Sequence, residues 1–109
     1  MPRYGIYGSH TPDTCPIYHA KFARVFVEIA ELDPEELAEA YGIHKIEAQY
    51  HSALEHTFLW IVEAEDPHLI EEFGVSTGLA SFNTLEIVPV HTFGETVDRL
   101  RVMHNIGLA

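Results

Sequence analysis

The chain has 109 residues, of which 47% are hydrophobic and 21% are charged, and its formal net charge is −11. This length fits a single domain, residues 1–109, and the apolar share is too high for a disordered chain. With only six Lys and Arg residues, the chain is a poor partner for nucleic acid, because phosphate binding needs a basic patch. Eight histidines are the unusual feature of this composition.

The single cysteine, Cys15, cannot form a disulfide within the chain, which favours a reducing compartment. The first residues lack the apolar core of a secretory signal, and no window approaches the roughly 18 apolar residues of a membrane span. We therefore expect a soluble cytoplasmic protein with no membrane partner.

The first predicted strand is Arg3–Ser9, where Gly5 and Gly8 indicate close approach of another backbone segment. A loop follows, and Pro16 is predicted to begin a helix with Cys15 as its N-cap. The apolar positions of this helix follow the spacing i, i+3, i+4, i+7: Phe22, Val25, Phe26 and Ile29.

Asp-Pro pairs predict the starts of two further helices. Asp33 caps a short helix that ends at Gly42, and Asp66 caps another that ends at Gly74. Three segments are predicted as strands and one as a terminal helix: residues 43–51, 56–65 and 84–90, and residues 95–103. The order predicts an α+β, ferredoxin-like βαββαβ fold with an extra short helix and a C-terminal helix.

The turn at residues 52–55 predicts a hairpin in which His51 pairs with His56. One face of this hairpin is uniformly apolar, so we expect the helices to cover it. The other face would be bare and would need a second subunit or a ligand over its aromatic residues. A register slip of one residue would exchange the two faces. The candidate ligand-binding residues on the bare face are Tyr7, Glu47, Gln49, Phe58 and Trp60.

The segments IVEAEDP at 61–67 and LEIVPV at 85–90 resemble the second half of dimeric α/β-barrel proteins, a likeness that covers residues 43–91. The chain is most similar to small uncharacterised families of that superfamily, including nickel-binding-like proteins. The resemblance implies a homodimer, a dimeric α/β barrel whose sheets face each other. The superfamily also includes muconolactone-isomerase-like enzymes, cofactor-free monooxygenases and haem-degrading enzymes. Trp60 and His68 match the Trp and His of the haem-degrading group, but Arg3–Ser9 lacks its Asn.

Histidines of the predicted hairpin form the first candidate metal site. Residues that face each other on adjacent strands have Cβ atoms about 4.5–5.5 Å apart, so His51 and His56 could bind one cation. His91 ends the last strand near the same edge and is the third candidate ligand. Such a site would suit Ni, Cu, Zn or Fe. The alternative is a pair of exposed histidines that bind only water.

A second candidate set comprises His10, Cys15 and His19. A helix N-terminus stabilises a thiolate, and the histidines could complete a metal site or activate a nucleophilic thiol. The alternative is a purely structural cap. We expect the two sets to lie at opposite ends of the sheet, so that one metal could not take ligands from both within one subunit.

Three functions are consistent with these residues. The first is a homodimer that binds a transition metal or small ligand through histidines at the edge of a sheet-lined cavity. The second is a cofactor-independent isomerase or monooxygenase that uses His51 or His56 as general base. The third is a structural module with incidental histidines. The sequence has no phosphate-binding loop or nucleophile elbow, so neither a nucleotide nor a flavin is expected.

Overall fold

The computed structural model describes residues 1–107. Its four-stranded sheet contains β1 (Arg3–Ser9), β2 (Ile43–Ser52), β3 (Thr57–Ala64) and β4 (Thr84–Pro89). The strands lie in the order β2-β3-β1-β4, and every neighbouring pair is antiparallel. This α+β arrangement is compatible with the ferredoxin-like fold expected from the sequence.

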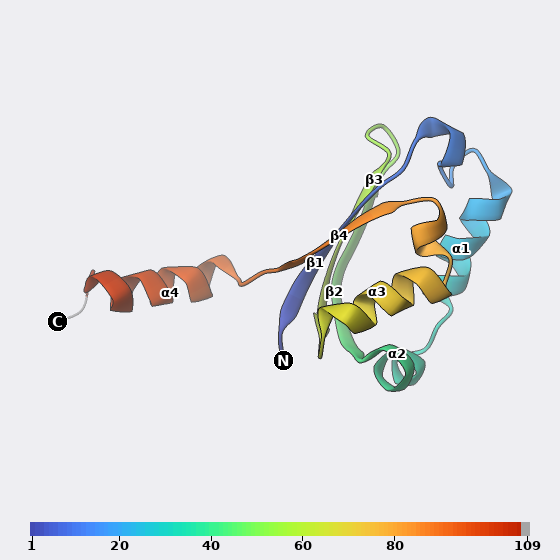
Figure 1. The fold of residues 1–109 in the computed structure, drawn as a ribbon. Coiled ribbons are helices and arrows are strands. Elements are labelled where there is room, and N and C mark those ends of the chain that lie inside the picture. The colour runs from blue at the N-terminus through green and yellow to red at the C-terminus, as the bar shows by residue number, and fades with distance from the viewer. Residues whose placement is uncertain (108–109) are drawn as a thin grey trace.

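Three helices cover one face of this sheet, and the fourth projects away from it (Figure 1). The covering helices are α1 (Ala20–Ala30), α2 (Pro34–Tyr41) and α3 (Pro67–Ser76), and the projecting helix is α4 (Phe93–His104). Short 3₁₀ helices lie in two of the connections: η1 (Pro12–Thr14) and η2 (Leu79–Ser81). Within residues 1–107, no helix has the length and apolar character that crossing a membrane requires.

Two predicted helix starts are confirmed. The Asp33 side chain accepts a hydrogen bond of 2.8 Å from the Glu36 backbone N–H, and Gly42 ends α2 with φ 63°. The Asp66 side chain likewise accepts from the His68 backbone N–H at 2.7 Å. Both carboxylates satisfy backbone donors that the first turn of a helix leaves free.

Two predicted helix boundaries are wrong, the start of α1 and the end of α3. α1 begins at Ala20 rather than at Pro16, and Cys15 follows η1 instead of capping α1. Gly74 lies inside α3, where an added Cβ would stand 2.7 Å from Leu85 Cδ1 on β4. This glycine therefore allows close packing of the helix on the sheet and does not stop the helix.

The predicted pairing of the hairpin is also wrong. His51 lies opposite Phe58 and Gln49 lies opposite Trp60, with an irregularity in β2 between Ile46 and Ala48. The turn therefore lies later in the sequence than expected, between Ser52 and Thr57, and includes His56.

The assignment of the two sheet faces is reversed. Phe58 and Trp60 are only 3% and 7% exposed and pack in the core with Phe73 of α3. Large aromatic side chains bury more apolar area than the aliphatic residues of the opposite face, and this favours their burial under the helices. The uncovered side, which we call the open face, carries five large hydrophobic side chains: Tyr7, Tyr50, Leu59, Ile61 and Val88.

Candidate metal centre

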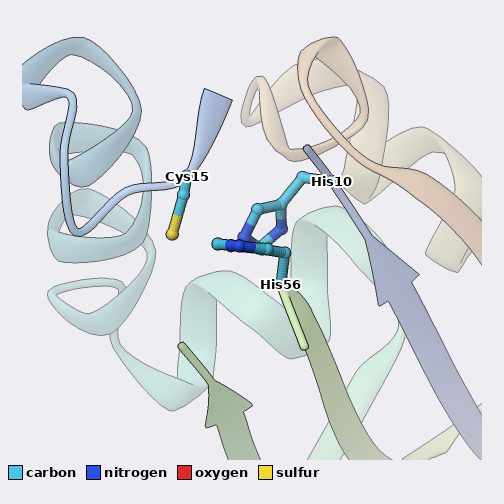
Figure 2. A group of neighbouring side chains, drawn as sticks. All are labelled: His10, Cys15 and His56. Atoms are coloured by element: carbon cyan, nitrogen blue, oxygen red, sulfur yellow. The ribbon is translucent and has the colours of Figure 1, made fainter. Parts of the chain in front are cut away.

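His10, Cys15 and His56 converge at one end of the sheet (Figure 2). Each offers one possible ligand atom, and these three atoms lie within 4.8 Å of one another. His10 directly follows β1, Cys15 follows η1, and His56 is the last residue before β3. The cluster thus joins three segments that are separate in the sequence.

The antiparallel pairing of β1 and β3 brings the two histidines together. Ser9 lies opposite Thr57, so the residue after β1 and the residue before β3 are neighbours. The His10 backbone N–H donates to the His56 carbonyl oxygen at 2.9 Å. The expectation that the two histidine sets lie at opposite ends of the sheet is therefore wrong, because the end of β1 adjoins the start of β3.

Cys15 reaches the cluster because η1 turns the chain back over the end of the sheet. Its backbone N–H donates to the Pro12 carbonyl oxygen at 3.4 Å, and its own carbonyl oxygen accepts from Tyr18 and His19. The Cys15 side chain is 0% exposed. A thiol enclosed in this way can contact the neighbouring histidines, but a substrate of ordinary size cannot reach it.

Asn83 fixes the protonation pattern of the His10 ring. The Asn83 side-chain N–H donates to the Leu79 carbonyl oxygen at 3.0 Å, which leaves the amide oxygen to face His10 Nδ1 at 2.8 Å. An amide oxygen only accepts, so His10 Nδ1 carries the hydrogen and donates. In the neutral ring, Nε2 is then left with a free lone pair.

His10 Nε2 and His56 Nδ1 are both buried, and neither has a hydrogen-bond partner in the part of the chain that the structure describes. Leaving such a polar atom unsatisfied costs about 1–3 kcal/mol. His56 also has φ 54°, a left-handed conformation that is unusual for a residue other than glycine. The strained backbone of His56 and the two unpaired ring nitrogens therefore lie at the same place, and each costs free energy.

His51 lies beside the cluster without belonging to it. Its ring stacks on His10 with centroids 5.4 Å apart and meets the edge of Phe26 at 5.6 Å. Burial lowers the pKa of His51, and the nearby charges of His10 and His56 lower it further. A lowered pKa favours the neutral form of the His51 ring.

The other predicted metal ligands lie elsewhere. His19 occupies the N-cap position of α1 without a side-chain hydrogen bond to the helix, and its ring lies against Phe22. His91 follows β4 at the opposite end of the sheet, where the Val90 backbone N–H donates to Arg3, and its Nδ1 lies 3.5 Å from a Glu95 oxygen. The expected position of His91 beside the hairpin turn is wrong, because β4 runs antiparallel to β1.

The predicted ligand-binding residues do not form one site. Phe58 and Trp60 belong to the core, and Gln49 lies exposed on the edge strand β2. Glu47 accepts a hydrogen bond of 2.8 Å from Arg3. Tyr7 lines a pocket of about 290 Å³ on the open face.

Sequence reasoning missed Asn83, which is 8% exposed and directly precedes β4. It also separated His56 from His10 and Cys15. A polar residue at the edge of an apolar strand was the available signal for Asn83, but its partner His10 is 73 residues away in sequence.

Comparison of the chain with protein-family models, curated proteins and solved structures found no match. The resemblance to dimeric α/β barrels therefore stays a prediction.

Proposed function

We propose that this protein binds a transition-metal ion through His10 Nε2, Cys15 Sγ and His56 Nδ1. The observation that carries the proposal is the pair of buried imidazole nitrogens that lack partners and lie beside a buried thiol. A cation would accept both lone pairs and would remove the cost of burying them unsatisfied.

The donor set indicates which metals are suitable. One thiolate and two neutral imidazoles favour Zn²⁺ or copper over hard ions such as Mg²⁺ and Ca²⁺, which prefer oxygen ligands. Ni and Fe accept imidazole as well and remain within the proposed class. Three protein ligands leave a fourth tetrahedral position for water or for a small ligand.

The surroundings of the cluster resemble those of established metal sites. Histidines that bind metals commonly donate their second ring N–H to a fixed acceptor, which orients the ring and raises its basicity. Asn83 supplies that acceptor to His10. Both histidines are only partly buried, so the cluster lies close to the protein surface. The proposed role is carriage, sensing or sequestration of the metal.

Metal analysis of the purified protein without an affinity tag tests the proposal. We expect about one equivalent of Zn²⁺ or copper for each chain. With Co²⁺ in its place, we expect a thiolate-to-cobalt charge-transfer band that is lost in Cys15→Ser. His10→Gln and His56→Gly should each abolish stoichiometric binding, and glycine suits the left-handed backbone at position 56.

Two variants serve as matched controls. His68 is an exposed histidine that lies near Glu71 on α3, and His19 is an exposed histidine at the start of α1. His68→Ala and His19→Asn should bind metal as the parent chain does. A folded parent chain that binds none of these metals, or that loses no affinity in Cys15→Ser and His56→Gly, would contradict the proposal.

The alternative proposal is a cofactor-independent isomerase or monooxygenase with His51 or His56 as general base. A pocket of about 460 Å³ lies beside His10 and could admit a small molecule. Its lining is rich in hydroxyl groups, from Ser9, Thr11, Thr14, Ser81 and Thr84. If the metal-free protein binds a small organic molecule, that result would favour this alternative.

A further inference from the structure

Helix α4 has no covering surface among residues 1–107 of its own chain. None of its twelve residues is buried among residues 1–107, and the helix projects beyond the end of the sheet (Figure 1). The radius of gyration is 16.5 Å, whereas a compact domain of this length has about 13 Å. An isolated helix of twelve residues is marginal in water, so α4 needs a partner surface to be stable.

One side of α4 carries an apolar stripe. Phe93, Val97 and Leu100 follow the spacing i, i+4, i+7 and therefore lie on one face of the helix. Phe93 is 83% exposed and Leu100 is 43% exposed. This stripe is long enough to pack along a sheet or another helix.

The open face of the sheet is the matching surface. Tyr50 is 68% exposed, Tyr7 and Val88 are also exposed, and Leu59 and Ile61 are partly exposed. Helices α1, α2 and α3 all lie on the other side of the sheet (Figure 1). Each chain thus presents both an apolar helix stripe and an apolar sheet face without a cover.

The charges of the chain favour a second copy as the partner. All seventeen Asp and Glu residues precede Arg99, so the body of the protein is strongly acidic. The second half of α4 carries Arg99 and Arg101 and no acidic residue. The end of the helix is therefore attracted to the acidic body of another chain.

Contacts at the base of α4 direct the helix away from its own open face. The Val90 backbone N–H donates to the Arg3 carbonyl oxygen at 3.0 Å, which continues the line of β4. Glu95 in the first turn binds the Arg3 guanidinium at 3.1 Å. These contacts hold the start of α4 at the end of the sheet, where it points outward (Figure 1).

We propose that two copies of this chain form a twofold homodimer in which each α4 packs its Phe93, Val97 and Leu100 stripe on the open face of the other copy. A twofold axis pairs each helix with the opposite sheet, so the assembly closes at two chains. The proposed metal ligands belong to neither the α4 stripe nor the open face, so the proposed dimer does not require a bound metal.

Light scattering of the full chain over a range of concentrations tests the dimer. We expect a dimer whose dissociation constant rises at least about tenfold in Leu100→Glu, because this change places a charge in the apolar contact. Val102 lies on the opposite side of α4, so Val102→Glu is the matched control and should leave the dimer unchanged.

A mixing experiment tests the exchange of helices. Ile61→Glu alters the open face, so this variant and Leu100→Glu should each be mainly monomeric. Mixing the two restores one intact contact, between the helix of Ile61→Glu and the face of Leu100→Glu, and should raise the dimer fraction. A monomeric parent chain, a Leu100→Glu dimer of parental strength, or no gain on mixing would each overturn the proposal.

Discussion

At the scale of single residues, the geometry of the cluster depends on the direction of individual hydrogen bonds. Asn83 uses its N–H to bind Leu79 and its oxygen to bind His10. This arrangement fixes the ring of His10 so that Nε2 faces Cys15 and His56. Removal of the Asn83 oxygen would free the ring without changing any proposed ligand.

We therefore expect Asn83→Leu to weaken metal binding about 10–100-fold, the range typical of lost outer-shell partners. Asn83→Asp keeps an oxygen that accepts from His10 and should retain most of the affinity. Competition with a chromophoric chelator measures both values, with circular dichroism to check folding. Equal affinities in the two variants would show that the hydrogen bond to His10 has no positioning role.

At the scale of secondary structure elements, the contact of β1 with β3 positions the candidate site. Gly8 lies opposite Phe58, and the Phe58 ring occupies the space that a Cβ at position 8 would need. The sequence predicts a close approach of backbone at Gly5 and Gly8, but aromatic rings take up the space at both positions: the Tyr7 ring lies 2.8 Å from the Cβ position of Gly5. The absence of a side chain at Gly8 lets the Phe58 ring stay in the core beside Phe26.

Gly8→Ala should lower the free energy of unfolding by about 1–3 kcal/mol, because the buried Phe58 ring would have to move. Gly94 is the control: an added Cβ there would meet only Thr92 Oγ1, at 4.0 Å. Gly94→Ala should leave stability unchanged or raise it by up to about 1 kcal/mol. Urea denaturation of both variants measures the difference, and an unperturbed Gly8→Ala would contradict the packing argument.

At the scale of the whole molecule, Arg3 joins elements that are far apart in sequence. Its guanidinium lies 2.8 Å from Glu47 on β2, 3.6 Å from Glu63 on β3 and 3.1 Å from Glu95 on α4. The hydrogen bond from Arg3 lowers the pKa of Glu47 and of Glu95. In a chain with so few cations, this one residue offsets repulsion among three carboxylates.

A lowered carboxyl pKa in the folded state contributes stability above the ordinary pKa of 4.5 and loses that contribution as the pH falls through the lowered value. We therefore expect Arg3→Gln to be less stable than the parent chain at neutral pH, and the difference to shrink in strongly acidic buffers. Urea midpoints across a pH series measure it. A difference that stays constant down to acidic pH would contradict the role of these ion pairs.

The sequence by itself determined two helix starts and the fold class. Asp33 and Asp66 indicated helix starts because their carboxylates cap nearby backbone groups, and the order of strands and helices indicated the α+β class. Only the tertiary structure decided the sheet faces and the cluster. Local spacing carries no information about which face the helices bury, nor that antiparallel pairing brings His10 to His56 and the turn of η1 brings Cys15 to both. These contacts join residues far apart in sequence, so they exist only once the sheet has formed.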